Sequence, residues 1–197
     1  MRYVLGVDEA GRGPLAGPVA VGVIAVAEGF DVAREFPGVG DSKQLTELAR
    51  EKLFKLLEGR ALRGDARFRV CYGTHTGIDA RGMTVAVRRA VRRGVMALAA
   101  PEEVEKIYLD GLLRAPAEYA QETIIKGDEL VPIISLASIA AKVSRDALMR
   151  RLARRYPLYG FERHKGYPTK AHYEALAIHG PCEIHRRSYL HRGGGRA

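Results

Sequence analysis

The sequence VDEAGRGPLAGPV, at positions 7–19, joins two apolar runs through a loop rich in glycine and proline. The first run, Tyr3–Val7, predicts a strand that ends at two adjacent carboxylates, Asp8 and Glu9. The segment Gly11–Gly17 is predicted to be a loop, because its glycines and its proline interrupt regular structure. The β-branched run Val19–Ala27 then predicts a second strand. Strands joined this closely favour an antiparallel meander at the start of a sheet.

Beyond this segment, short apolar runs alternate with stretches of helical periodicity. Further strands are expected at Phe68–Thr74, Val104–Leu109 and Glu122–Lys126. Helices are expected at Thr46–Leu57, from Ile78 onward, at Ser138–Arg155 and at Thr169–Ile178, the last beginning at a Thr169 cap and stopping at Gly180. The apolar stripe of the helix at 138–155 is predicted to consist of Val143, Ala147, Leu148 and Leu152. The predicted fold class is α/β: a mixed sheet flanked by helices, with a small helical C-terminal extension.

Length and composition predict an ordinary folded chain. The 197 residues suit one domain with a modest appendage, and 47% hydrophobic residues suffice for a buried core. The longest apolar stretch, Pro18–Ala27, is too short to cross a bilayer, and the N-terminus has no apolar signal segment. Cys71 and Cys182 lack metal-type spacing and are interpreted as reduced thiols. We therefore expect a cytoplasmic monomer that does not associate with membranes.

The charge is unevenly distributed along the chain. From position 141 to the end there are 13 Lys/Arg and 4 Asp/Glu, whereas the first 140 residues hold 19 of each. The whole net charge of +9 thus lies in the last part of the chain. A basic flank beside a neutral body favours a polyanionic partner such as nucleic acid. The alternative is a solvated basic face with no specific partner.

Carboxylates occur where three predicted strands end. Asp8 and Glu9 follow the first strand, Asp110 follows the strand at 104–109, and Asp128 follows the strand at 122–126. If these strand ends are neighbours, the carboxylates converge and need a positive counter-charge. Oxygen ligands without a Cys or His cluster favour Mg²⁺ or Mn²⁺, and two such ions can promote phosphodiester cleavage. For each residue alone, a turn or cap role is the ordinary alternative.

Seven segments together resemble the ribonuclease HII family, in the family's order and over most of the chain. The first is the opening sequence at positions 7–19. The others are DSKQL at 41–45, DG at 110–111, KGD at 126–128, ASIAAKVSRD at 137–146, HKGYPT at 164–169 and HRRS at 185–188. The last two segments are most similar to the bacterial branch. Leu112 and Leu136 depart from the residues usual in the family, and neither is at a catalytic position.

The resemblance implies a ribonuclease H-like fold and an endoribonuclease. It implies that Asp8, Glu9, Asp110 and Asp128 hold the metal ions, two of Mg²⁺ or Mn²⁺. It implies that the backbone of Gly11, Arg12 and Gly13 contacts the ribose 2′-hydroxyl and that Tyr167 stacks at the RNA-to-DNA junction. The substrates would be RNA/DNA hybrids and DNA with embedded ribonucleotides, cut 5′ of the ribonucleotide to give a 3′-hydroxyl and a 5′-phosphate. Such an enzyme would remove ribonucleotides during DNA repair and replication.

We expect a catalytic domain at 1–150 and a helical substrate-binding region at 151–190. The Gly/Arg-rich composition of 191–197 predicts a disordered tail. Lys43, Lys142 and Arg145 are candidate phosphate contacts, although the latter two could equally lie on a solvated helix face. A solvated face is also expected for Arg150, Arg151, Arg154 and Arg155.

Asp146 is predicted to pair with Arg150 at i,i+4. The histidines at 164, 172, 179 and 185 would suit zinc poorly, and His164 and His185 are interpreted as structural or close to phosphate. Two rival functions remain: a non-catalytic nucleic-acid-binding module, and a related nuclease that acts on branched DNA.

Overall fold

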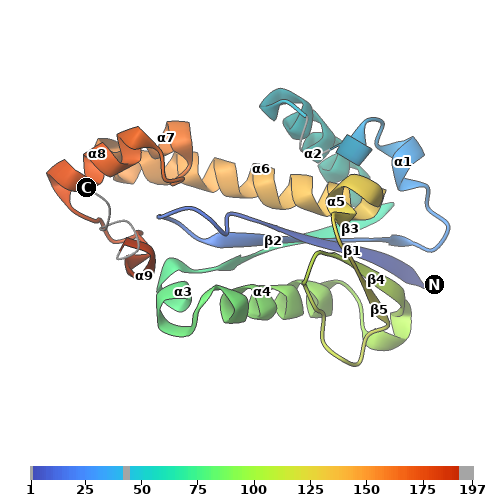
Figure 1. The fold of residues 1–197 in the computed structure, drawn as a ribbon. Helices are drawn as coiled ribbons and strands as arrows, with labels where there is room; N and C mark the ends of the chain where they lie inside the picture. Colours follow the sequence, from blue (N-terminus) through green and yellow to red (C-terminus); the bar gives the residue numbers. More distant parts are fainter. Residues whose placement is uncertain (1, 42–44, 191–197) are drawn as a thin grey trace.

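The computed structural model describes residues 2–41 and 45–190, and its centre is a five-stranded sheet (Figure 1). The strands lie in the order β3-β2-β1-β4-β5. β2 pairs antiparallel with β1 and with β3, while β4 lies parallel to both β1 and β5. The strands are β1 (Tyr3–Ala10), β2 (Val19–Ala27), β3 (Ala66–Gly73), β4 (Val104–Asp110) and β5 (Gln121–Ile124). The predicted mixed α/β sheet, with its opening antiparallel meander, is confirmed.

Helices cover both faces of the sheet (Figure 1). α6 and α2 lie over one face and α4 lies over the other, each above its own apolar core. Among the described residues the α-helices are α1 (Val32–Glu35), α2 (Glu47–Leu62), α3 (His75–Arg81), α4 (Met83–Leu98), α5 (Gly127–Leu130), α6 (Pro132–Arg155), α7 (Phe161–His164), α8 (Lys170–His179) and α9 (Arg187–Leu190). Short 3₁₀ turns lie at Val39–Asp41, Pro101–Glu103 and Pro157–Tyr159.

The central helix α6 is longer and more deeply buried than its sequence predicts. It begins at Pro132, a residue suited to the first helical position, and not at Ser138. Two strand glycines let α6 approach closely: a Cβ on Gly6 or Gly22 would collide with the carbonyl oxygen of Ile133 or Ala137. The predicted apolar stripe is only partly correct: Val143 and Leu152 pack against two cores while partly buried, but the helix buries other positions between 145 and 153 more deeply. These buried side chains are Arg145, Asp146, Met149 and Ala153.

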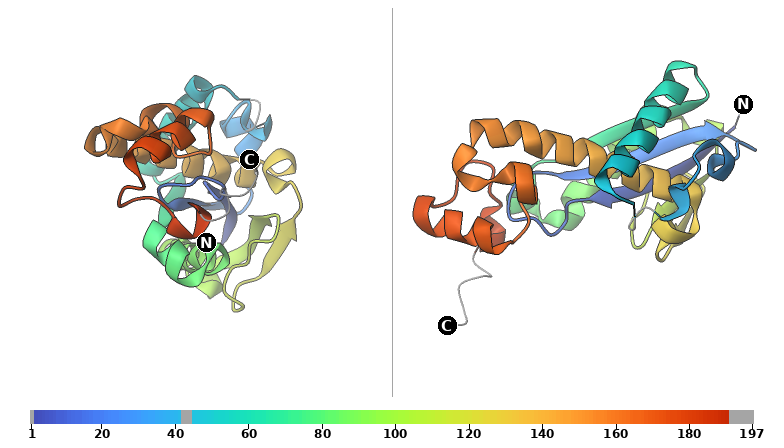
Figure 2. Two further views of the ribbon diagram at one scale, coloured as in Figure 1. Left: turned by 60° about the vertical axis from the view of Figure 1, so that its left-hand side comes forward. Right: turned by 90° about the horizontal axis from the view of Figure 1, so that it is seen from above.

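The C-terminal helices form a subregion with its own small core at one end of the molecule, away from the N-terminus (Figure 2). Met149 and Ala153 of α6 pack there against Tyr159, Phe161 and Ile184. Since α6 continues through position 150, the predicted division falls inside a continuous helix and not in a linker. The segment 191–197 lies outside the described residues. Within the part of the chain that the structure describes, we find no helix with the length and apolar character to span a membrane.

Candidate active site

The four predicted carboxylates line one cavity of about 490 Å³. Asp8 and Glu9 lie within β1, which continues through them to Ala10. Asp110 is the last residue of β4, and the parallel register that pairs Val7 with Leu109 brings it beside Asp8. Asp128 lies in the first turn of α5, just after β5. The sheet order thus converts sequence positions 8, 9, 110 and 128 into one cluster.

A tight connection after β5 positions Asp128. Lys126 adopts a left-handed conformation with φ 56°, which turns the chain sharply into α5. Gly127 follows, and a Cβ there would lie 2.6 Å from Cδ1 of Ile134, so a larger residue would require the Ile134 side chain to shift. The turn aims the backbone N–H of Asp128 at Oδ1 of Asp110, 3.4 Å away. The sequence KGD therefore serves to hold two carboxylates close together.

The site concentrates negative charge away from water. Burial raises the pKa of Asp8 well above its ordinary value, and the charges of Glu9 and Asp110 raise it further against an opposing hydrogen bond from Ser138. Burial likewise raises the pKa of Glu9, while Arg12 lowers it. Arg12 Nη1 donates to Glu9 Oε1 at 2.9 Å. The second oxygen of Glu9, Oε2, is buried and accepts no hydrogen bond from any described residue.

These features fit a hard divalent cation. The cavity contains carboxylate oxygens, one of which is buried and lacks a donor, and no Cys or His lines it. Such ligands suit Mg²⁺ or Mn²⁺ better than zinc. Within residues 2–41 and 45–190, no group of three acidic, Cys or His side chains lies close enough together to hold a metal ion without rearrangement.

The glycine loop beside the carboxylates is held by a buried arginine that the sequence analysis did not assign. Arg186 is fully buried and donates to three carbonyls of the loop. Nη2 binds Gly11 O at 2.7 Å, Nη1 binds Arg12 O at 2.8 Å and Nε binds Gly17 O at 2.9 Å. Among the described residues, the N–H groups of Arg12 and Gly13 donate to no acceptor. Arg186 binds the carbonyls of the same two peptide units, Gly11 O and Arg12 O, so these N–H groups are held in place and can donate to a ligand.

Arg145 holds the other half of the loop, and neither role predicted for it is supported. Its side chain is fully buried, so it is neither on a solvated face nor placed to contact phosphate. The guanidinium donates to Pro18 O at 2.8 Å, Ala16 O at 3.2 Å and Lys165 O at 3.1 Å. It also lies directly against Gly11, whose φ of 92° and lack of a side chain allow the contact. Arg145 therefore ties the loop to the C-terminal region.

Tyr167 and Lys142 face the same cavity from the C-terminal side. Both residues line it, and Lys142 Nζ lies 5.5 Å from the centre of the Tyr167 ring. Lys142 also pairs with Asp146 at 3.0 Å. The prediction that Asp146 pairs with Arg150 is wrong, because Arg150 instead reaches α2 and pairs there with Glu47 and Glu51.

The structure adds residues to the predicted site and leaves one unplaced. Lys43 lies outside the described residues. Arg50 of α2 and Ser138 of α6 both line the cavity, although the sequence analysis did not propose them. Ser138 belongs to the ASIAAKVSRD segment, so a signal was present in the sequence. Arg50 belongs to none of the segments that carried the resemblance, and only the packing of α2 brings it to the cavity.

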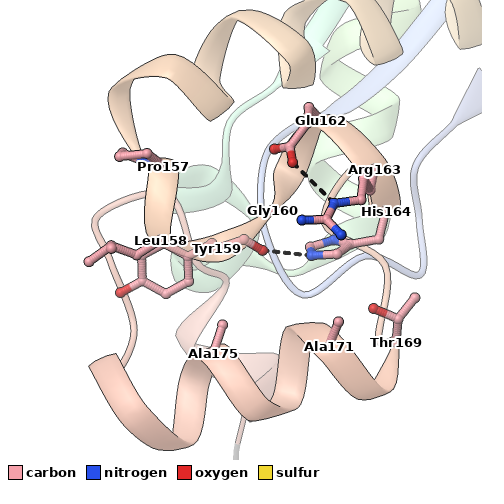
Figure 3. Close-up of a pocket in the computed structure, with 10 residues that line it drawn as sticks. All are labelled: Pro157, Leu158, Tyr159, Gly160, Glu162, Arg163, His164, Thr169, Ala171 and Ala175. Atoms are coloured by element: carbon pink, nitrogen blue, oxygen red, sulfur yellow. Dashed lines mark hydrogen bonds and ion pairs between the residues drawn. The ribbon is translucent and has the colours of Figure 1, made fainter.

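A second cavity, of about 510 Å³, lies in the C-terminal region (Figure 3). Pro157, Leu158, Ala171 and Ala175 form much of its lining, and Glu162 is paired with Arg163. His164 turns its Nε2 to the carbonyl of Tyr159, 2.7 Å away. The cavity holds none of the predicted site residues, so size alone does not identify the active site.

Of the two roles expected for His185, structural or close to phosphate, its burial and its contact with His172 favour the structural one. His172 and His185 contact each other through their Nε2 atoms at 3.0 Å, and His172 Nδ1 contacts the carbonyl of Tyr167 at 2.9 Å. Burial, together with the nearby His172, lowers the pKa of His185 to about 4.

Comparison with known proteins agrees with this geometry. A model of the family "Ribonuclease HII" matches residues 5–192. A ribonuclease HII from Geobacter sulfurreducens is 42% identical over 188 residues, which cover 95% of this chain and 82% of that protein. The crystal structure of ribonuclease H2 from Pyrococcus horikoshii has a TM-score of 0.74 at 32% identity and covers 94% of this chain and 93% of that one. Bst-RNase HIII, solved in complex with Mn²⁺, shares the fold with a TM-score of 0.63 at 21% identity, covering 90% of this chain and 70% of that one.

Proposed function

The chain belongs to the ribonuclease HII family, whose members hydrolyse RNA in RNA/DNA duplexes, and from this premise we propose that it also cuts 5′ of single ribonucleotides embedded in DNA. The products would be a 3′-hydroxyl and a 5′-phosphate, and the biological role would be ribonucleotide removal from DNA. The observation that carries the proposal is the convergence of Asp8, Glu9, Asp110 and Asp128 in one cavity beside the glycine loop.

The carboxylates have the composition of a phosphodiester-cleaving site. Asp8, Glu9, Asp110 and Asp128 would hold Mg²⁺ or Mn²⁺, which when bound would activate water and stabilise charge on the leaving oxygen. A similar fold, Bst-RNase HIII, was solved with Mn²⁺. Two observations support this assignment: Glu9 Oε2 is buried without a donor among the described residues, and burial beside Glu9 and Asp110 raises the pKa of Asp8. Arg12 restrains Glu9 from the solvent side.

Selection of the ribonucleotide would rest on the glycine loop and Tyr167. The N–H groups of Arg12 and Gly13 point to no described acceptor and could bind the 2′-hydroxyl, which distinguishes RNA from DNA. Backbone contacts of this kind do not depend on base identity. Tyr167 would stack on the adjoining deoxyribose, held by the contact between its carbonyl and His172. Lys142, and Lys43 if it reaches the cavity, would contact backbone phosphates.

The C-terminal region would hold the duplex against the catalytic region. Its exposed arginines at 151, 154 and 155 provide the long-range attraction expected from the charge distribution. α6 passes between the two regions and carries Lys142 into the cavity, so the two regions act as one rigid unit in this proposal. The monomeric state and cytoplasmic location stay predictions.

A substrate panel tests the proposal. We would compare a DNA duplex with one ribonucleotide, a long RNA/DNA hybrid, a branched DNA and an all-DNA duplex, each with Mg²⁺, Mn²⁺ or chelator. Metal-dependent cleavage 5′ of the single ribonucleotide, with no cut in the DNA substrates, is expected. Cleavage of the branched DNA instead, or tight binding without cleavage under either metal, would overturn the proposal.

A further inference from the structure

The outer face of α4 carries an unbalanced positive charge. Arg88, Arg89, Arg92 and Arg93 are all exposed, and the helix contains no acidic residue. The net charge of positions 1–140 does not reveal this surface, because that part of the sequence holds 19 basic and 19 acidic residues. In space, however, α4 lies over the face of the sheet opposite α6 (Figure 1). The molecule therefore has a second basic surface besides the C-terminal region.

The arginines of α4 are not engaged in ion pairs. Among residues 2–41 and 45–190, neither they nor the exposed Arg114 pairs with a carboxylate, whereas Arg60, Arg150 and Arg155 all do. Arg93 donates to the Tyr72 carbonyl at 2.7 Å, and Arg92 contacts the sulfur of Met96 at 3.3 Å. Exposed guanidinium groups that pair with no described carboxylate are available to an external anion.

Two further cavities connect this surface to the active site. The first, of about 220 Å³, is lined by Arg12, Arg88 and Arg114 over an apolar floor of Val87 and Leu113. It shares Arg12 with the carboxylate cavity. The second, of about 510 Å³, shares Arg88 and Arg114 with the first and adds Arg92. Arg12, Arg88, Arg114 and Arg92 thus line successive cavities from the carboxylates to the outer face of α4, and Glu118 is the one acidic residue that lines the second of these cavities.

The linking residue is Arg12. Its guanidinium pairs with Glu9 at 2.9 Å, yet 51% of its side chain is exposed, so it borders both cavities. The residues next to Asp110 complete the path, because the chain that leaves β4 runs directly into Leu113 and Arg114. The end of the catalytic strand and the basic helix are therefore joined over a few residues.

We propose that the cavity between Arg12, Arg88 and Arg114 is an anion subsite that binds a backbone phosphate of the nucleic-acid duplex. The next cavity adds Arg92, which would contact a further phosphate. Guanidinium groups can bind phosphate oxygens in pairs, and such contacts position a duplex without reading its sequence. The proposal rests on the proposed function only in that the ligand is the nucleic-acid substrate. It gives the substrate contacts on both sides of the carboxylates, from the C-terminal region and from α4.

Salt-dependent binding tests the subsite separately from catalysis. Fluorescence anisotropy in chelator, on a DNA duplex carrying one ribonucleotide, would compare wild type with Arg88→Gln, Arg114→Gln and the double variant. Each loss of a phosphate contact should weaken binding roughly three- to tenfold and reduce the slope of log K against log salt by about 1, and the double variant by about 2. Arg88 and Arg114 are exposed, as is Arg34 of the control described below, so the melting curves of all the variants should match that of wild type.

Arg34→Gln is the matched control, because it makes the same charge change on α1, over the face of the sheet opposite α4 (Figure 1). It should keep the wild-type affinity and salt slope. Equal slopes in wild type, Arg88→Gln and Arg114→Gln would overturn the subsite, as would equal losses in Arg34→Gln. Because no metal is present, these results do not depend on whether the enzyme cuts at a ribonucleotide, which the substrate panel measures.

Discussion

Replacing Arg186 with methionine removes the donor for three carbonyls that hold the glycine loop, those of Gly11, Arg12 and Gly17. Arg186 is fully buried, so water does not readily replace it. A buried acceptor left without a donor costs about 1 kcal/mol or more, which gives roughly 3 kcal/mol of lost stability. For a chain of this length, that corresponds to a fall in Tm of about 6–12 °C. Because the same contacts position the loop, ribonucleotide-specific cleavage should fall as well.

Urea denaturation and thermal melting would measure the loss, with Arg187→Met as the control. Arg187 is the neighbouring residue, but its side chain is exposed, so its replacement should change stability by less than about 0.5 kcal/mol. Arg186→Lys should lie between the two, because an ammonium keeps the charge and cannot reach all three carbonyls. The reasoning is refuted if Arg186→Met unfolds at the wild-type urea concentration.

Three other changes have defined outcomes. Gly11→Ala should lower Tm and activity together, since a Cβ at φ 92° meets Arg145; unchanged melting would contradict this contact. The pKa of His185 is about 4 in the folded protein against 6.5 ordinarily, so between these values the unfolded chain binds a proton that the folded chain does not. The contribution of His185 to the free energy of unfolding should therefore be complete above pH 6.5 and fall by up to about 3 kcal/mol as the pH drops to 4. In His185→Asn, the urea midpoint should depend less on pH over this range. Tyr167→Ala should reduce cleavage at a single ribonucleotide more than cleavage of a long hybrid, and an equal loss on both substrates would argue against a junction-sensing role.

The order of elements was predictable from sequence because local patterns specified it. An apolar run in β1 and a β-branched run in β2 lie on either side of a Gly/Pro loop, and α8 begins at its Thr169 cap as expected. The carboxylates could be nominated from their places after strands and from the family resemblance. Their convergence could not, since it depends on β4 pairing in parallel with β1 across nearly a hundred residues.

Two errors share one physical cause, which is burial that hydrophobicity does not reveal. α6 begins at Pro132, but its first turns are apolar on most sides because the sheet and other helices enclose them, so no amphipathic pattern marks the start. Arg145 was expected to face water or phosphate, and no role was predicted for Arg186. They are buried because backbone carbonyls of a distant loop satisfy their donors, and that pairing exists only in the folded chain.

The central claim is that the carboxylate cluster cuts DNA 5′ of a ribonucleotide with a divalent cation. Its most direct test is cleavage of an end-labelled DNA duplex that contains one ribonucleotide, by wild type and by Asp110→Asn, with Mn²⁺ and with chelator. The account predicts a single product from wild type with Mn²⁺, none with chelator, and a rate about a hundredfold or more lower for a folded Asp110→Asn. Cleavage by Asp110→Asn at the wild-type rate, or a wild-type cut in chelator, would contradict it.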